Sequence, residues 1–328
     1  MVYIGYNIIR MEDTMKKITR FLMKAISSVD IDMRKNYQKQ RKMQEILHID
    51  YLKFLEKTLD ASIEVDGREI PIRLFYPKGQ VQEGLLLFFH GGGWIYGNVE
   101  TYHKVCRNLA NETNQIVISV DYRLAPENPF PRGLEDCYDV AKKFYTENTI
   151  LDVPSSKITL IGDSAGGNLA AAVSLLARDR KEFTVSKQIL IYPVTYNNHT
   201  ESSPFPSIVT EGKDYLLTTK NVMDYMDLYI SNIEDAENPY VAPLLAEDVS
   251  NQPATLIITA EHDPLRDEGE AYGEKLREAG NFVEVHRILD TIHGFFNFGL
   301  LQKANKETYT YMKHFLKGDE INGQEREK

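Results

Sequence analysis

Cysteine is scarce in this chain of 328 residues, which contains only Cys106 and Cys137. The two do not form a Cys-x-x-Cys pair, so the sequence offers no cysteine-based zinc or redox site. Two cysteines are also too few for the disulfide framework of a small secreted domain. We therefore expect two free, buried thiols in a protein of the reducing cytoplasm.

Long apolar runs and an excess of basic residues are missing as well. The longest uninterrupted apolar runs, such as residues 85–89, are far shorter than the roughly 20 residues that cross a bilayer. The first residues carry no small-residue cleavage site, which argues against a secretory signal. Acidic residues outnumber basic ones by 48 to 38, and the net charge of −10 repels a polyanion. The sequence thus excludes a membrane span and a nucleic-acid partner.

Short apolar runs and helical patterns alternate along most of the chain. Residues 61–65 and 70–76 alternate around Asp66-Gly67, as in a β-hairpin. The continuous apolar runs that we also expect to be strands are residues 85–89, 116–120, 158–161, 189–194, 256–260 and 283–289. Continuous apolar runs of this length are typical of strands covered on both faces. Helical patterns between them span residues 105–111, 134–146, 167–179, 268–279 and 301–315. This alternation predicts an α/β fold with a largely parallel sheet of about eight strands.

Two stretches depart from this alternation and define the expected domains. Residues 1–57 are polar, amphipathic and helical, without proline. About sixty residues between 194 and 254 contain a helical stretch at 219–231 but no clear strand, which is typical of a lid or cap. We therefore divide the chain as follows: an N-terminal helical segment 1–57, a core of residues 58–195 and 251–318, a cap insertion 196–250 and a flexible tail 319–328.

The strongest chemical signal is a serine between a predicted strand and a predicted helix. The sequence Gly162-Asp-Ser164-Ala-Gly166 has the form Gly-x-Ser-x-Gly in the strand–turn–helix context that gives this motif its meaning. The helix N-terminus would direct amides and partial positive charge toward an oxyanion formed there. The motif alone leaves open whether Ser164 is a nucleophile or only caps the helix.

A serine nucleophile needs a base, and the base needs an acid that orients it. Asp263 and His293 each follow a predicted strand, and the chain order Ser, Asp, His is that of the α/β-hydrolases. Among the other acids, we expect Glu261, Asp267 and Asp290 to be solvated or to cap helices.

The other histidines compete less well for the role of base. We expect His286 to pack within its strand, and the orientation of His262, which adjoins the acid, stays open. The remaining candidates are expected at the surface: His48, His103, His199 and His314.

A run of three glycines, His90-Gly-Gly-Gly-Trp94, directly follows the strand predicted at 85–89. Acyl transfer needs donors directed at the carbonyl oxygen as it becomes negative. We assign that role to the backbone amides of Gly92, Gly93 and Ala165, and expect His90 to brace the loop. A phosphate-binding loop is excluded because no lysine follows the glycines at Walker spacing. A further block, residues 121–127, contains no nucleophile or base, and we expect its charges to form supporting ion pairs.

Five motifs together resemble the hormone-sensitive-lipase-like branch of the α/β-hydrolases, the bacterial family IV esterases. They are HGGGW at 90–94, DYRLAPE at 121–127, GDSAGG at 162–167, EHDPLRDE at 261–268 and HGF at 293–295. The resemblance implies an α/β-hydrolase fold of eight strands with a helical cap made of residues 1–57 and about 196–250. It also implies hydrolysis of short-chain acyl esters with no metal and no organic cofactor. Members often form dimers, so a homodimer is an option.

The sequence therefore predicts a cytoplasmic serine carboxylesterase, acetyl-esterase-like, with Ser164, Asp263 and His293 as its catalytic triad. Trp94 and Phe295 adjoin the catalytic loops and are candidates for the substrate pocket. We expect most tyrosines and methionines of the cap insertion to pack the cap on the core. Two alternatives stay open: an amidase or arylformamidase with the same triad, and a binding protein similar to the gibberellin receptors, which lack the histidine that this chain retains.

Overall fold

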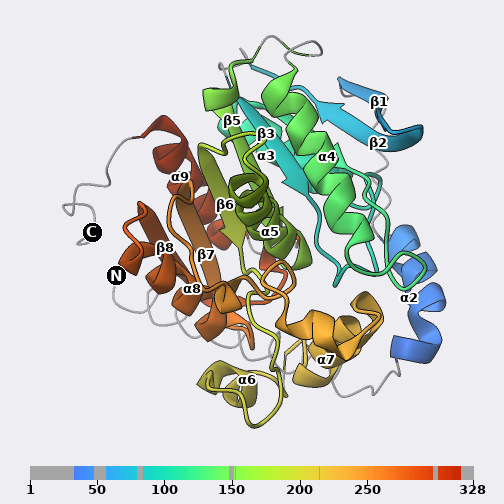
Figure 1. Ribbon diagram of the computed structural model, residues 1–328, viewed down its shortest axis with the longest axis vertical. Helices are drawn as coiled ribbons and strands as arrows, with labels where there is room; N and C mark the ends of the chain where they lie inside the picture. The colour runs from blue at the N-terminus through green and yellow to red at the C-terminus, as the bar shows by residue number, and fades with distance from the viewer. Residues whose placement is uncertain are drawn as a thin grey trace, which may run out of the picture.

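The computed structural model of the protein describes residues 33–47, 57–79, 84–147, 151, 153–213, 215–297 and 302–318. Eight strands form one sheet in the order β1-β2-β4-β3-β5-β6-β7-β8 (Figure 1). Strand β2 runs antiparallel to β1 and β4, and all other neighbours are parallel. This confirms the predicted α/β-hydrolase sheet, which is mostly parallel and eight-stranded.

All eight predicted strands are present, with ends that differ by a few residues. Their bounds are β1 Thr58–Val65, β2 Arg68–Phe75, β3 Leu85–Phe89, β4 Ile116–Val120, β5 Ile158–Asp163, β6 Lys187–Ile191, β7 Ala254–His262 and β8 Val283–Ile292. Asp66 and Gly67 both have positive φ angles, 50° and 76°, as the tight hairpin between β1 and β2 requires. Strands β3 and β4 are buried at every position, which explains their continuous apolar sequence.

Helices cover both faces of the sheet and enclose two hydrophobic cores. Helices α3 (His103–Thr113) and α9 (Gln302–Lys317) cover one face, whereas α4 (Arg132–Thr146), α5 (Ala165–Arg180) and α8 (Arg266–Glu278) cover the other. Short 3-10 helices complete the elements: η2 Ser155–Lys157, η3 Ile233–Glu237, η4 Pro243–Leu245 and η5 Phe295–Asn297. Cys106 and Cys137 are free and buried, one in each core.

The register of the parallel strands brings the loops with chemical signals to one edge of the sheet. Phe89, at the end of β3, pairs with Gly162 of β5, and Asp163 pairs with Ile191 at the end of β6. At the other side, His262 at the end of β7 pairs with Ile292 at the end of β8. The residues that follow these strands therefore emerge at the same edge, which is where open α/β sheets bind their ligands.

Two segments far apart in the sequence lie side by side at one end of the molecule. Helix α2 (Met33–Leu47) contacts α7 (Thr219–Tyr229) of the insertion, as Figure 1 shows. Arg34 of α2 pairs with Asp224 of α7 at 3.2 Å and with Asp227. A short helix, α6 (Pro206–Thr210), precedes α7 in the insertion.

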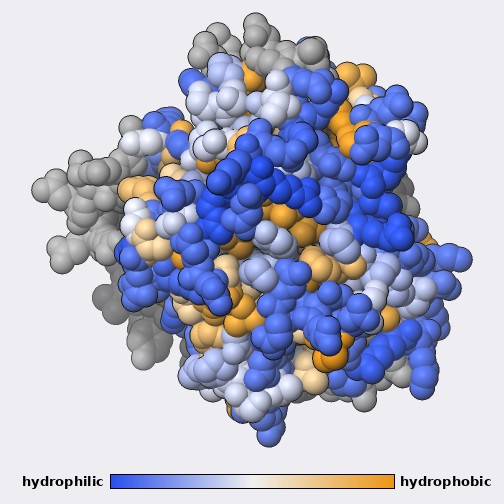
Figure 2. All heavy atoms as spheres, viewed as in Figure 1, coloured by the Kyte–Doolittle hydropathy of each residue, from blue (hydrophilic) through white to orange (hydrophobic). Residues whose placement is uncertain are grey.

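The division into core, cap and tail stays a prediction, because residues 1–32, most of 48–57 and 319–328 lie outside the described residues. Within the part of the chain that the structure describes, no helix has both the length and the apolar character needed to cross a membrane. The face seen in Figure 2 is mostly hydrophilic, and its apolar side chains form small separate patches.

Candidate active site

Ser164 occupies a sharp turn between β5 and α5. Its φ and ψ angles, 53° and −119°, lie where a residue with a side chain is strained. The turn requires glycine on both sides: a Cβ on Gly162 would lie 2.2 Å from the Gly166 oxygen, and a Cβ on Gly166 would lie 2.0 Å from the Phe89 oxygen. The backbone N–H of Ser164 donates to the Ile191 oxygen at 2.8 Å, which anchors the turn to β6.

The structure brings Ser164, His293 and Asp263 into one chain of hydrogen bonds. His293 Nδ1 lies 2.7 Å from Asp263 Oδ2, and His293 Nε2 lies 2.8 Å from Ser164 Oγ. An ionised carboxylate only accepts hydrogen bonds, so Nδ1 carries the imidazole proton and donates it to Asp263. The lone pair of a neutral ring is then on Nε2, which accepts from the serine hydroxyl. This arrangement can remove the serine proton as the hydroxyl attacks a carbonyl carbon.

Asp263 is held in a fully buried position. Its side chain is 0 % exposed, and its second oxygen, Oδ1, accepts the backbone N–H of Leu265 at 2.9 Å. His293 is 8 % exposed, and its ring packs against that of Tyr192 at a centroid distance of 4.8 Å. Asp263 is thus shielded from water, while His293 and Ser164 lie nearer the surface.

The glycine loop after β3 turns tightly beside Ser164. Gly92 and Gly93 have φ angles of 112° and 61°, and the N–H groups of Ile95 and Tyr96 donate to the Gly92 oxygen at 3.1 and 2.9 Å. Within the described chain, the amides of Gly92, Gly93 and Ala165 donate to no other residue. The Ala165 amide is at the N-terminus of the 16-residue helix α5, whose dipole favours negative charge. Three unsatisfied donors near a nucleophile can stabilise an oxyanion.

Asp163, which sequence reasoning left without a role, connects three of these loops. Its Oδ1 accepts the Gly91 amide at 2.8 Å, and its Oδ2 accepts the Tyr102 hydroxyl at 3.1 Å and the Asn297 amide group at 3.3 Å. Burial raises the pKa of this carboxyl to about 6. The Asp sits inside the Gly-x-Ser-x-Gly motif, but a buried carboxylate there could not be distinguished from an exposed one by local sequence.

His90 braces the glycine loop, as the sequence predicts. Its Nδ1 donates to the Gly91 oxygen at 2.9 Å, and its ring stacks on Tyr122 with centroids 4.2 Å apart. The Tyr122 hydroxyl also donates to the His90 oxygen at 2.7 Å. Burial lowers the pKa of His90 to about 4, so the ring is neutral at physiological pH and has no place among the proton carriers.

Two histidines that were expected at the surface are buried, and that prediction is wrong for both. His103 is 1 % exposed, and its Nδ1 lies 3.4 Å from the Arg73 guanidinium. His199 is 2 % exposed, and its Nε2 lies 2.9 Å from Glu268, a fully buried carboxylate. In both cases the partner is distant in the sequence and the neighbouring residues are polar, so the local sequence does not indicate that the histidine is buried.

Among the described residues, neither His286 nor His314 binds the serine. His286 is half-buried in β8 and stacks on Tyr311 at 3.8 Å, in agreement with its predicted packing. His314 is also half-buried, in α9, and His48 lies outside the described residues.

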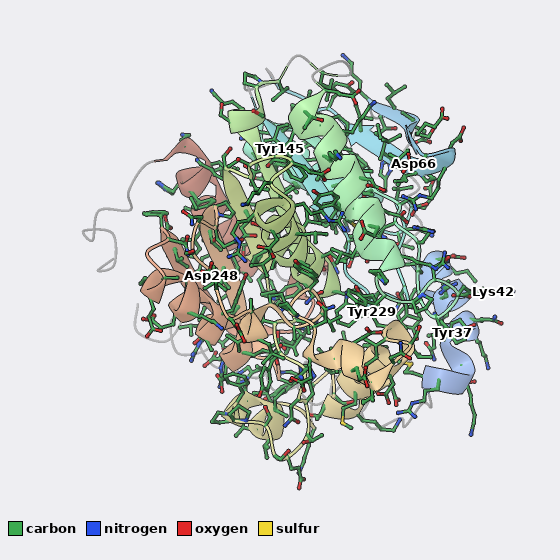
Figure 3. The ribbon with its side chains drawn as sticks, viewed as in Figure 1. Tyr37, Lys42, Asp66, Tyr145, Tyr229 and Asp248 are labelled. Atoms are coloured by element: carbon green, nitrogen blue, oxygen red, sulfur yellow. The ribbon has the colours of Figure 1, made fainter. Side chains whose placement is uncertain are left out.

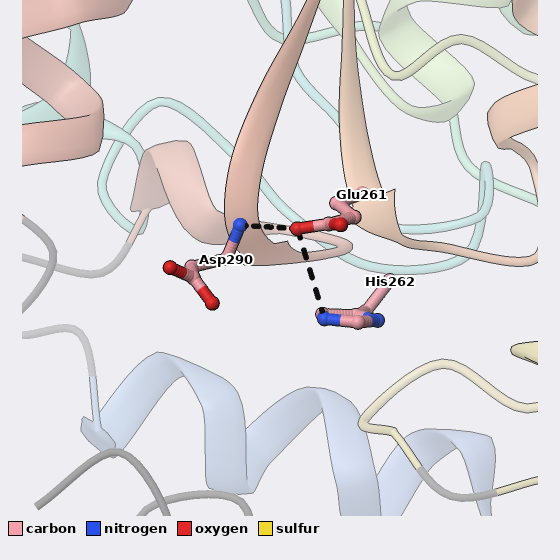
Figure 4. Close-up of side chains that lie close together, drawn as sticks. All are labelled: Glu261, His262 and Asp290. Carbon is pink, nitrogen blue, oxygen red and sulfur yellow. Dashed lines mark hydrogen bonds and ion pairs between the residues drawn. The ribbon is translucent and has the colours of Figure 1, made fainter. Parts of the chain in front are cut away.

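Two of the rival acids, Glu261 and Asp290, lie close to His262 (Figure 4). The third, Asp267, pairs with Arg266 at 2.8 Å and accepts the Ser207 backbone N–H at 2.8 Å. Glu261 Oε2 accepts the Asp290 backbone N–H at 2.6 Å and lies 3.8 Å from His262 Nε2, while His262 Nδ1 lies 3.2 Å from Glu211. One ligand atom each from Glu261, His262 and Asp290 lies within 4.8 Å of the others, a spacing that could hold a metal ion. Asp290 is exposed, and only its backbone N–H, not its carboxylate, binds Glu261; exposed acidic groups commonly lie together in this way without an ion.

The two pocket candidates pack into opposite parts of the molecule. Trp94 is 2 % exposed and stacks on Tyr229 of α7, with ring centroids 4.3 Å apart and an interplanar angle of 4°. Phe295 is 0 % exposed and meets Tyr192 edge to face in the core that α3 and α9 cover. Figure 3 shows Tyr229 between α7 and the N-terminal end of α4. Trp94 therefore joins the insertion to the glycine loop.

Of the two methionines of α7, one packs on the core and the other is exposed. Met226 is 5 % exposed, whereas Met223 is 38 % exposed. Tyr225 lies directly on the glycine loop, because a Cβ on Gly93 would be 2.7 Å from its ring. The ring of Tyr225 also meets that of Tyr96 edge to face at 5.8 Å. The insertion thus covers the loop that carries two of the candidate oxyanion donors.

Comparisons with known proteins agree with this geometry. A family model described as alpha/beta hydrolase fold matches residues 86–297. An arylesterase of Saccharolobus solfataricus is 40 % identical over 240 residues, covering 73 % of this chain and 77 % of that protein. The carboxylesterase NlhH of Mycobacterium tuberculosis is 37 % identical, covering 76 % and 78 %. The solved structure of a hyperthermophilic esterase from Pyrobaculum calidifontis superimposes with a TM-score of 0.82 at 36 % identity, covering 92 % and 97 %.

Proposed function

Because this chain belongs to the hormone-sensitive-lipase-like branch of the α/β-hydrolases, and is thus a carboxylic ester hydrolase, we propose that it cleaves short-chain acyl esters through an acyl-enzyme. The observation that carries this proposal is the unbroken chain from Asp263 through His293 to Ser164, with separations of 2.7 and 2.8 Å. It ends at a nucleophile on a strained turn beside three unsatisfied amides.

The proposed mechanism has two halves that use the same groups. Ser164 Oγ attacks the ester carbonyl as His293 Nε2 removes its proton, and Asp263 stabilises the imidazolium that forms. The amides of Gly92, Gly93 and Ala165 donate to the carbonyl oxygen while it carries negative charge. His293 then gives the proton to the leaving alcohol. In the second half, water attacks the acyl-serine, His293 again takes a proton, and Ser164 regains it when the acid leaves.

The test is a series of initial rates on p-nitrophenyl esters from acetate to decanoate, with wild type and Ser164→Ala in parallel. We expect wild type to hydrolyse acetate or butyrate fastest, and the variant to lose about 10⁶-fold in kcat, as serine hydrolases do. Ser164→Ala activity equal to that of wild type would remove Ser164 from the nucleophile's role. A maximum at decanoate would contradict the short acyl preference.

A matched ester and amide pair distinguishes the esterase from an amidase on the same triad. We expect p-nitrophenyl acetate to be cleaved and p-nitroacetanilide to be left nearly intact. Faster cleavage of the anilide would favour the amidase. If the wild-type protein hydrolysed neither compound, the result would favour a binding protein.

A further inference from the structure

One side chain of α2 reaches two loops at the edge of the candidate site. The Arg41 guanidinium donates from Nε to the Ile95 oxygen at 3.0 Å and from Nη2 to the Ala125 oxygen at 3.2 Å. Its two Nη groups also bind the two carboxylate oxygens of Glu127, both at 3.2 Å. The residue lies 54 positions before Ile95, so no local sequence pattern indicates this contact.

The loop that Arg41 holds controls the direction of a proposed oxyanion donor. The carbonyl of Gly92 and the N–H of Gly93 belong to one planar peptide group, so fixing the carbonyl also fixes the N–H. That carbonyl accepts from the N–H groups of Ile95 and Tyr96. The next carbonyls are held too: Ala125 N–H donates to the Trp94 oxygen at 3.0 Å, and Arg41 donates to the Ile95 oxygen.

Glycine has no side chain to restrict its backbone, so the orientation of this peptide depends on such hydrogen bonds. Gly93 is covered by Tyr225 on one side, but ring contact alone does not select one peptide orientation. Without the guanidinium, the Ile95 and Ala125 oxygens lose a charge-assisted donor, and the turn from Gly92 to Tyr96 has less to hold its outer peptides.

We propose that Arg41 is a positioning residue for the oxyanion donor of Gly93, a proposal that rests on the esterase function above. The side chain touches neither the nucleophile nor the base. It joins α2 to the glycine loop and to the loop of residues 121–127. Helix α2 therefore contributes to catalysis and does not only cover the site. An ion pair with Glu127 alone would be worth little at this partly exposed position.

Helix α2 offers a matched control for this role. Arg34 lies on the same helix and also binds carboxylates, but its partners Asp224 and Asp227 belong to α7 and not to the glycine loop. Figure 3 shows α2, with Tyr37 and Lys42 labelled, apart from the helices that cover the sheet. Changing Arg34 weakens the attachment of α2 to α7, whereas changing Arg41 removes the attachment to the loop.

The experiment measures kcat and KM on p-nitrophenyl acetate for wild type, Arg41→Met, Arg41→Lys and Arg34→Met. It also measures the Ki of a trifluoromethyl ketone, which forms an oxyanion on the serine, and thermal unfolding of each variant. We expect Arg41→Met to lose about tenfold or more in kcat, with KM within about twofold, because misdirected donors act on the transition state. Its Ki should rise by a similar factor. Arg41→Lys retains one donor and should be intermediate.

Arg34→Met should keep kcat within about twofold even if its melting temperature falls as far as that of Arg41→Met. Equal losses of kcat in both variants, or an unchanged kcat and Ki in Arg41→Met, would overturn the positioning role. The proposed function is judged separately: it fails only if wild type does not hydrolyse the ester or if Ser164→Ala does so equally well. Failure of the Arg41 proposal leaves that result untouched.

Discussion

Individual residues at the candidate site are held in states that would be unfavourable in isolation. Ser164 has a strained backbone, Asp163 is a fully buried carboxylate, and His90 is a buried neutral imidazole. Each is compensated by neighbours from other loops, as with the Gly91 amide and the Tyr102 hydroxyl on Asp163. Strain and buried polarity of this kind collect at functional sites, where surrounding contacts maintain them.

The buried His90 gives the free energy of unfolding a predictable pH dependence. Its pKa is about 4 in the folded protein and 6.5 in the unfolded chain, so between these values the unfolded state binds more protons. Stability therefore falls as pH drops from 6.5 toward 4. For wild type compared with His90→Gln, we expect an extra loss of roughly 2 kcal/mol between pH 7.5 and pH 5.

Urea unfolding at the two pH values checks this expectation. Asp163 contributes with the opposite sign, because its pKa of about 6 lies above that of an unfolded aspartate and the folded state binds the extra proton. That contribution is common to both proteins and cancels in the difference. A His90→Gln variant that loses as much stability as wild type would show that His90 takes up a proton while folded.

At the scale of helices and strands, the sequence predicts an element's ends correctly where the local hydrophobic pattern determines them. Strands β3 and β4 have the predicted ends, because each is a fully buried apolar run. Strand β6 was predicted to continue to Val194 but ends at Ile191, where Tyr192 takes a φ of 36° and Pro193 follows. The helix predicted at 219–231 ends at Tyr229. These earlier ends depend on tertiary contacts, which local sequence propensity does not predict.

The site shows the same division between local and distant information. Ser164, Asp263 and His293 follow strands and could be selected from sequence, and the structure places them in contact. Glu268 and Arg41 could not be selected, because no motif of known chemistry indicates their roles and their partners lie 73 and 54 positions away. Glu268 lies within the motif at 261–268, but only the fold shows what it binds.

Glu268 connects helix α8 to the start of the insertion, and its loss should destabilise that junction. Its Oε1 accepts the amides of Thr195 and Tyr196 at 2.7 and 3.1 Å, and its Oε2 lies 2.9 Å from His199. In Glu268→Gln, the negative charge that these groups bind is lost, and an NH₂ group replaces one of the two acceptors. We expect a loss of about 3 kcal/mol in the free energy of unfolding, measured by urea denaturation.

Glu270→Gln is the control on the same helix. Glu270 binds Arg287 at 2.6 Å, but both side chains are partly exposed, so we expect a loss below about 1 kcal/mol. Similar losses in the two variants would contradict a special role for the buried carboxylate.

At the scale of the whole molecule, the sheet separates two cores, each with one buried thiol. Cys106 lies in the core that α3 and α9 cover, and Cys137 in the core that α4 covers. Both are 0 % exposed, and burial raises the pKa of each thiol well above its usual range. Thiolate is the reactive form, so both should be inert until their core opens.

A cytoplasmic location and a homodimer stay predictions from the sequence.

Labelling with a disulfide reagent such as DTNB tests this expectation on each face. For Cys106→Ala and Cys137→Ala, each with one remaining thiol, we expect reaction in native buffer at least about 10³-fold slower than in urea, since a stable core opens rarely. Reaction of either thiol at the same rate in both conditions would show that its face of the sheet is open in the folded protein.

The order of the site's residues along the chain has a consequence for synthesis. A ribosome makes Arg41 and the glycine loop first, then Ser164, and only much later His293, which follows β8 at the edge of the sheet. In the proposed mechanism, Ser164 is therefore without its base during the synthesis of more than a hundred residues. We therefore expect a chain that ends before His293 not to hydrolyse esters, and activity to begin only when the residue after β8 joins the site.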